Sequence, residues 1–201
     1  MTEKVRDNGQ AAKLAVPCID TPRLRLVPLT HDHGDGMFAL WREPAVCRHA
    51  GDACDEHGAP ITLPARSRAD SDGIIRFFIA HARAGKGFRW AMLRSEDGAF
   101  VGALGFNSLV TGVRCDATQA DGDEQVLPEL AFHLHPSHWG RGYMREACTA
   151  ALEWLRHAHA ATGVEAWAED ANAACVALLR RLGFQSAGGL RDGARRHARA
   201  L

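Results

Sequence analysis

A glycine-rich turn near residue 140 is the part of the sequence whose residue types best suit a chemical role. The pattern predicts a strand over Glu129–His135, then the turn Pro-Ser-His-Trp-Gly-Arg-Gly, then a helix from Tyr143. Unpaired N–H groups at a helix N-terminus bind phosphate, the helix dipole assists, and glycine lets the backbone approach such a ligand closely. Arg141, Arg145 and His138 could add positive charge, so the turn could hold a phosphorylated ligand.

The two common nucleotide-binding motifs do not explain this turn. The sequence contains no G-x-x-x-x-G-K-[ST], and the third glycine of a dinucleotide fingerprint is missing. By itself, the G-x-G pattern is equally compatible with a tight strand-to-helix connection.

Several motifs, taken in order, give the turn a more specific meaning. The pattern P-x-x-W-G-R-G-Y-M-x-E-A over residues 136–147 resembles the coenzyme A-binding motif of the GNAT acetyltransferase superfamily, in its RimJ/RimL-like branch. Residues 21–29, 100–105 and 172–184 resemble the first strand, the third strand and the late helix of that branch. The resemblance implies the GNAT fold: an α/β (α+β) protein with a central mixed, mostly antiparallel twisted sheet of six to seven strands, flanked by about four helices.

The same resemblance implies a reaction. The protein would transfer an acetyl group from acetyl-CoA to an amine, either a protein N-terminus or a small molecule, by direct attack on the thioester. No metal is expected. The residues implied to contact coenzyme A are Phe132, His133, Leu134, Ser137, His138, Trp139, Gly140, Arg141, Gly142, Tyr143, Met144, Asn172 and Cys175.

Two positions depart from the family pattern. Ser137 stands where the superfamily has Gln or Arg, so only its N–H can serve, and Cys175 stands where the late helix usually has Ser. These departures motivate an alternative function, a non-catalytic acyl-CoA-binding sensor or partner module on the same fold.

Acetyl transfer needs a base for the amine, donors for the developing oxyanion and an acid for the leaving thiolate. Glu129 is the candidate base, acting through a water, with His133 or His135 as a substitute; an exposed carboxylate and surface histidines are the structural alternatives. The backbone N–H groups of 132–134 are the implied oxyanion donors. Cys175 could protonate the thiolate, or could simply pack in its helix.

A second cluster of residues could bind metal. Cys47, His49, Cys54 and His57 lie within eleven residues, and four such side chains could bind zinc. Their spacing matches no common zinc finger, and the inferred reaction needs no metal, so we expect no metal site.

The composition limits the classes of partner. The 24 Lys and Arg balance the 24 Asp and Glu, so the chain as a whole has no excess positive charge to attract nucleic acid or an anionic membrane. No apolar run is long enough to span a bilayer, and the N-terminus lacks the apolar core of a secretory signal. We expect a cytoplasmic protein with reduced cysteines, for which a homodimer is plausible.

The patterns divide the chain into a flexible leader, 1–20, and a single domain, 21–201. The expected elements are strands at 23–27, 89–93, 100–106, 129–135 and 164–168, and helices around 37–41, from Ser71 or Asp72 to Gly85, at 140–160 and at 172–182. Residues 185–188 and 195–201 are candidate final strands, although the last has weak β propensity. Residues 49–71 suggest a long loop, and 111–127 an extended hairpin connection or insertion.

These loops are expected to form the acceptor pocket together with the first helices. Their acidic residues could attract a cationic amine, although solvated loops explain most of them. The candidates are Asp52, Asp55, Glu56, Asp121, Asp123 and Glu124, with Trp41, Arg42 and Arg48 as further lining residues.

Overall fold

The computed structural model describes residues 15–109, 127–159 and 161–201. The helices are α1 (Gly34–Trp41), α2 (Pro44–Cys47), α3 (Arg68–Arg83), α4 (Tyr143–His159) and α5 (Ala173–Arg181), with short 3-10 turns η1 (His31–His33) and η2 (Pro136–His138). The strands are β1 (Ile19–Asp20), β2 (Leu24–Pro28), β3 (Ala53–Cys54), β4 (Pro60–Ile61), β5 (Phe88–Arg94), β6 (Phe100–Phe106), β7 (Leu130–Leu134), β8 (Gly163–Glu169), β9 (Gln185–Arg191) and β10 (Ala194–Ala200). No helix among these residues is long and apolar enough to cross a membrane.

The main sheet is split into two parts. Five strands pair antiparallel in the order β1-β2-β5-β6-β7, and three more pair antiparallel in the order β8-β10-β9. A single parallel bridge between Glu129 and Glu165 joins the two parts. The predicted α/β fold with a mostly antiparallel sheet is therefore confirmed, and the gap between β7 and β8 gives it an opening.

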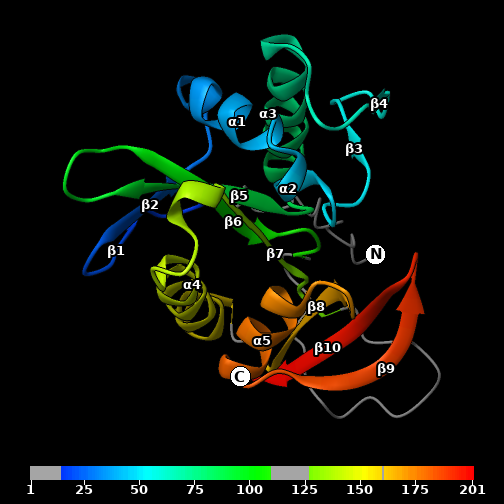
Figure 1. Ribbon diagram of the computed structural model, residues 1–201. Coiled ribbons are helices and arrows are strands. Elements are labelled where there is room, and N and C mark those ends of the chain that lie inside the picture. The colour runs from blue at the N-terminus through cyan, green and yellow to red at the C-terminus, as the bar shows by residue number, and fades with distance from the viewer. Residues whose placement is uncertain (1–14, 110–126, 160) are drawn as a thin grey trace, which may run out of the picture.

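The helices cover the two faces of the larger sheet (Figure 1). Helices α1 and α3 lie on one face, where Met37, Leu40 and Ile75 form a core with the alanines of β5 and β6. Helix α4 lies on the other face, over a larger core that contains Trp90, Leu104 and the apolar side of the helix. The predicted apolar stripe of α4 is confirmed, because Met144, Cys148, Ala151, Leu152 and Leu155 are all buried.

The start of α3 differs from the prediction. Ser67, rather than Ser71 or Asp72, caps the helix, since its side chain accepts from the Asp70 N–H while the Asp70 carboxylate accepts from the Ser67 N–H. This reciprocal capping box begins the helix four residues earlier. Ser71 instead lies buried in the first turn, where its hydroxyl donates to the Arg68 carbonyl.

The N-terminal boundary also differs. Ile19–Asp20 pairs with β2, and the Trp90 indole donates to the Pro17 carbonyl at 2.7 Å. The folded part therefore begins before residue 21. Of the predicted leader, the structure describes residues 15–20, and β1 takes up the last two of them. Residues 1–14 and most of the predicted 111–127 connection lie outside the described residues.

Two further features add detail to the predicted elements. The first helix is preceded by η1, whose N-cap is Thr30. The predicted 49–71 loop contains the β3–β4 hairpin. Both candidate final strands are confirmed as β9 and β10.

Candidate functional site

The site begins where β7 and β8 separate. Glu165 N–H donates to the Pro128 carbonyl at 2.9 Å, and beyond the Glu129–Glu165 bridge no further strand pairing joins β7 to β8 among the described residues. The two strands then diverge, and β7 becomes the open edge of its sheet. An open edge leaves backbone donors and acceptors available to a ligand.

Particular amides of β7 face this opening. Glu129 and His135, at the two ends of the strand, both hydrogen-bond to the β6 side. Because hydrogen bonding alternates along an antiparallel strand, the N–H groups of Phe132 and Leu134 point to the opposite edge, toward β8. The Leu134 carbonyl on that edge accepts from the Trp139 indole at 2.7 Å, which brings the glycine turn against the end of β7.

The turn that follows β7 has the backbone geometry expected of a phosphate cradle. Gly140 and Gly142 have φ of 71° and 77°, values that residues with a Cβ rarely adopt. The Gly142 carbonyl accepts from the Glu146 N–H, so the helix begins here and the amides of its first turn have no intrahelical acceptor. The sequence therefore places two glycines where the chain must turn sharply into α4.

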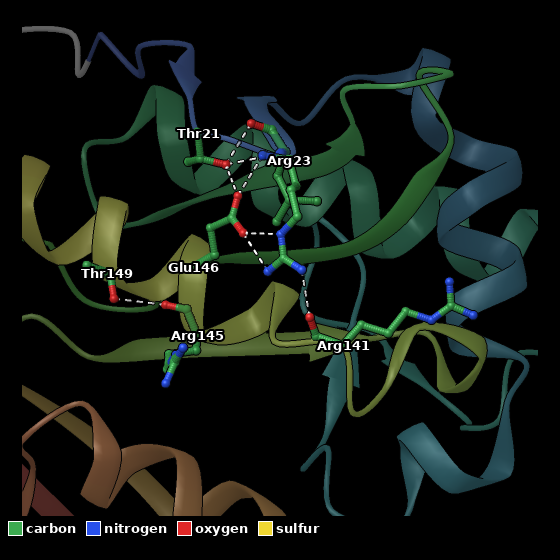
Figure 2. A network of polar contacts seen from close by, with 7 residues as sticks. Thr21, Arg23, Arg141, Arg145, Glu146 and Thr149 are labelled. Atoms are coloured by element: carbon green, nitrogen blue, oxygen red, sulfur yellow. Dashed lines mark hydrogen bonds and ion pairs between the residues drawn. The ribbon is translucent and has the colours of Figure 1, made fainter.

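An ion pair fixes this turn to the start of β2 (Figure 2). The Glu146 carboxylate accepts from the Arg23 backbone N–H at 2.8 Å, the Arg23 Nε at 2.7 Å and the Thr21 hydroxyl at 2.7 Å. Arg23 Nη1 also donates to the Arg141 carbonyl at 2.9 Å, and its guanidinium lies 4.8 Å from the Tyr143 ring centre. The backbone of the turn is thus held from behind, away from the opening.

The Arg141 and Arg145 side chains point away from this network (Figure 2), and both are exposed. Neither forms an ion pair within the described chain. His138 adds a buried Nδ1 that has no hydrogen-bond partner among the described residues. Its pKa is lowered by burial and by repulsion from Arg141, Arg94 and His135. Because Arg141 and Arg145 are exposed and form no ion pair within the described chain, both side chains are free to bind an anion.

The N-terminus of α5 forms the opposite wall. Asn172 caps the helix, because its Oδ1 accepts from the Cys175 N–H at 3.2 Å. Burial raises the pKa of the Cys175 thiol to about 11, so the thiol is protonated at neutral pH. The predicted cap is confirmed.

These walls enclose one continuous cavity of about 1280 Å³. It runs from the glycine turn, along the gap between β7 and β8, to residues 45–52 and to the tip of the β9–β10 hairpin. Glu129 and the residues predicted to contact coenzyme A line it, except Ser137 and His138; the alternative base His135 does not.

Comparisons with known proteins match this architecture. A family model described as an acetyltransferase (GNAT) domain matches residues 23–185, which is most of the chain. The chain belongs to the GNAT acetyltransferase family. It is an enzyme of the class that transfers an acetyl group from acetyl-CoA to an amine.

Individual relatives are distant. An uncharacterized N-acetyltransferase, YoaA of Bacillus subtilis, is 25% identical over 88% of this chain and 87% of its own. A structure of a putative ribosomal-protein-serine acetyltransferase from Vibrio cholerae superposes with a TM-score of 0.69 at 16% identity, covering 92% and 97% of the two chains. RimL, a ribosomal L7/L12 alpha-N-protein acetyltransferase in complex with coenzyme A, gives 0.69 at 15% identity, covering 92% and 98%. The two structures support the fold alone.

In this GNAT chain the carboxylate of the predicted base, Glu129, is bound by two other side chains. The Glu129 side chain is 12% exposed, and its Oε1 accepts from Asn107 Nδ2 at 2.5 Å while its Oε2 pairs with Arg191 Nη2 at 2.9 Å. Asn107 in turn accepts from the buried guanidinium of Arg89. Burial lowers the pKa of Arg89 to about 9, which leaves it charged at neutral pH. Glu129 thus lies between two cations on the cavity wall.

His133 reaches the cavity from β7 and packs against Trp41, with ring centres 4.6 Å apart. Burial, together with repulsion from Arg89, lowers the pKa of His133 to about 3. The imidazole is therefore neutral at pH 7 and able to accept a hydrogen bond, but it is a weak base. His135 is turned to the η2 turn, where its Nδ1 contacts the Ser137 hydroxyl at 2.8 Å and accepts the Ser137 N–H.

Those contacts explain why Ser137 departs from the expectation. Its N–H, the group expected to serve the ligand, already donates to His135, and its side chain is not on the cavity wall. The turn η2 directs residues 137 and 138 away from the opening, and the first amides of α4 face it instead.

The four candidate zinc ligands are dispersed. The Cys47 thiol donates to the Trp41 carbonyl, His49 pairs with Glu169 at 2.7 Å, and His57 is largely exposed. No group of three or more His, Cys, Asp or Glu within the described parts of the chain is placed to hold a metal ion. His49 instead links the segment after α2 to the end of β8, on the wall of the cavity.

The predicted acceptor residues are only partly brought together. Arg48 and Asp52 line the cavity. Asp55 caps the β3–β4 turn and Glu56 pairs with Arg76, so neither serves the site. Trp41 contributes by packing on His133, and Arg42 lies over Phe38. Asp121, Asp123 and Glu124 lie outside the described residues.

Some lining residues were missed by the sequence analysis. They include Asn107, Trp167, Glu169, Arg181, Arg191 and Asp192. No local signal shows that Arg191 meets Glu129, because 62 residues separate them.

Proposed function

We propose that this protein is an N-acetyltransferase of the RimJ/RimL-like branch that acetylates a primary amine by direct attack on the thioester of acetyl-CoA. One observation carries the proposal. The free amides of β7 lie in a single cavity between the glycine turn on one side and Glu129 and His133 on the other. Such an arrangement suits a donor and an acceptor that meet at the strand.

The residues present fit coenzyme A, which supplies the acetyl group as an activated thioester. The amides at the start of α4 and the unpaired side chains of Arg141 and Arg145 suit a pyrophosphate. Trp139, half exposed at the turn, offers apolar surface, and the cap at Asn172 orients the facing helix. The Phe132 and Leu134 amides offer hydrogen bonds to an extended arm.

The same amides are our candidates for stabilising charge on the thioester oxygen. Backbone N–H groups fixed in a strand need no reorganisation when negative charge develops, and removing one such donor typically costs about 10²–10³ in rate. The new bond is between the amine nitrogen and the carbonyl carbon, and the bond that breaks is between that carbon and sulfur.

Two protons must move in this reaction. Glu129 accepts the amine proton through a water, and His133, being neutral, accepts a hydrogen bond that orients the amine. Cys175 is protonated and lines the cavity from α5, so it donates to the departing sulfur. Its raised pKa makes it a weak acid, so we assign it a modest share of the rate.

The acceptor class rests on resemblance. Two of the structural neighbours are named as ribosomal-protein acetyltransferases, which favours a protein N-terminus. A small-molecule amine remains the alternative. The cavity extends past Glu129 to residues 45–52 and to Arg191, which leaves room for an acceptor beyond the reacting amine.

The test is thiol release from acetyl-CoA with a serine-initiated peptide and with putrescine. Glu129→Gln should lower kcat by about 10²–10⁴, the usual contribution of a general base. Glu153→Gln, an exposed carboxylate on α4, is the matched control and should be unchanged.

Full activity of Glu129→Gln would show that the base lies elsewhere. Tight coenzyme A binding without thiol release for any amine would instead favour the non-catalytic sensor.

A further inference from the structure

The contact between Glu129 and Arg191 has a feature that the reaction alone does not require. Glu129 belongs to the segment that starts β7, and its side chain is 12% exposed. Arg191 comes from the end of β9, and its side chain is 50% exposed. A buried carboxylate on the cavity wall is therefore paired with a cation that reaches it from the solvent side.

The position of Arg191 allows it to leave. Its guanidinium lies 4.3 Å from the centre of the Trp167 ring, which also lines the cavity. The next two residues, Asp192 and Gly193, form the hairpin turn with φ of 51° and 82°. The only hydrogen bond that the described residues give to the Arg191 side chain is the one to Glu129 Oε2.

The rest of the carboxylate's surroundings are fixed. Oε1 is held by Asn107, which is itself held by the buried Arg89. Oε2 is the side on which Arg191 is bound. A ligand cation that enters the cavity can therefore reach the carboxylate at Oε2 by taking the place of the guanidinium, without disturbing Asn107.

We propose that Arg191 is a resident counter-ion of Glu129, and that the ammonium group of the acceptor, together with the water that links it to Glu129, replaces it as the acceptor binds. Arg191 is thus a positioning residue that keeps the buried carboxylate paired while the acceptor side is empty, and Glu129 itself provides the selectivity for cationic amines. This inference rests on the proposed function, since it assumes that the acceptor amine approaches Glu129.

The exchange conserves charge. One cation leaves the carboxylate as another arrives, so the buried charge never lacks a partner, a state that would be costly. Arg191 remains against the face of Trp167, a favourable position for a guanidinium. An uncharged amine gains nothing from the exchange, because it cannot replace the lost ion pair.

The experiment measures binding rather than turnover, so that its failure is distinguishable from failure of the proposed function. The coenzyme A-loaded protein is titrated with propylammonium and, separately, with methoxyamine, which is similar in size and uncharged at pH 7.5. Binding is followed by NMR through the backbone amide signals of Phe132 and Leu134.

Arg191→Ala should tighten propylammonium binding by about two- to fivefold, the size expected when a half-exposed ion pair no longer competes. Methoxyamine binding should not change. Arg191→Lys should restore the wild-type affinity for propylammonium. Glu129→Gln should weaken propylammonium binding and should remove the effect of Arg191→Ala in the double variant.

Arg195→Ala is the control, because Arg195, on β10, forms an ion pair of the same 2.9 Å length with the exposed Asp170 and does not line the cavity. It should leave both affinities unchanged. The proposal is overturned if Arg191→Ala leaves propylammonium binding unchanged or weakens it. It is also overturned if the affinities for both probes shift equally, because that result indicates a general structural effect. Loss of turnover in Glu129→Gln alongside either result would leave the proposed base intact.

Discussion

Arg23 donates hydrogen bonds to the Glu146 carboxylate from both its backbone N–H and its guanidinium, although 123 residues separate the two in the sequence. The contact ties the start of β2 to the first turn of α4, directly behind the glycine turn (Figure 2). Burial alone would raise the pKa of Glu146, but hydrogen bonds from Thr21 and Arg23 outweigh it and hold that pKa below its usual value. The carboxylate is therefore charged whenever the protein is folded near neutral pH.

Glu146→Gln should loosen the turn without altering the residues that face the opening. We expect a loss of stability of about 1 kcal/mol, since a partly buried set of donors loses its charged acceptor. We also expect KM for acetyl-CoA to rise while kcat stays near wild type. Urea unfolding and steady-state kinetics test both, with Glu153→Gln as the control; an unchanged KM would contradict the role given to this contact.

Gly140→Ala tests the backbone geometry of the turn. Gly140 has φ of 71°, and a Cβ built there would meet no atom within 4 Å, so the substitution acts through backbone strain alone. Stability should fall by about 1–2 kcal/mol, and KM for acetyl-CoA should rise. Gly98→Ala is the matched control, with φ of 72° and equally open space in the β5–β6 turn. It should lose similar stability and keep its KM, and an equal rise in KM for both variants would count against the cradle.

Cys175 should react slowly with thiol reagents. With a pKa of about 11, only about one thiol in a thousand is ionised at pH 8, and the thiolate is the reactive form. Cys18 is exposed and should be modified before Cys175. Peptide mapping after brief iodoacetamide treatment tests the order. Rapid labelling of Cys175 at pH 8 would show that its thiol is less protected than the structure indicates.

His197 should make the stability depend on pH. It is 4% exposed, neither ring nitrogen has a partner among the described residues, and burial lowers its pKa. The folded state thus resists a proton that the unfolded state takes up below pH about 6.5, so stability present above that pH is lost as the pH falls. For one such histidine the loss at pH 5.5 reaches at most about 1.4 kcal/mol.

His197→Leu should raise the free energy of unfolding at pH 7.5 and reduce its decline toward pH 5.5. Urea titrations at the two pH values measure the difference. His157→Leu, at an exposed position on α4, serves as the control and should leave the decline unchanged. A decline as steep in His197→Leu as in the wild type would show that other groups cause it.

The sequence predicted the parts of the site that are local. The strand, the two glycines and the helix after them are contiguous. The periodicity of apolar residues and the glycines of the turn were therefore enough to place Trp139 to Tyr143. The cap at Asn172 was found for the same reason. The start of α3 was missed because its capping box uses Asp70 where Glu or Gln is usual.

The long-range contacts could not be predicted in the same way. Arg191 meets Glu129, and His49 meets Glu169, only because β9 and the segment after α2 both fold against the same cavity. The strand β10 was doubtful because Ala and Arg have little β propensity. It forms because it pairs along both edges, with β8 and with β9, and this tertiary pairing outweighs the local preference.

The order β8-β10-β9 also bears on how the molecule is made. The strands β8 and β9 do not pair with each other. Apart from the single bridge from Glu165 of β8 to Glu129, each pairs with β10, which is synthesised after both. On the ribosome, the five-stranded sheet and α4 can therefore form while β8 and β9 still wait for their common neighbour. The hairpin that brings Arg191 to Glu129 assembles only once β10 has emerged, so a chain stalled before residue 194 would carry a complete glycine turn beside an unfinished acceptor wall.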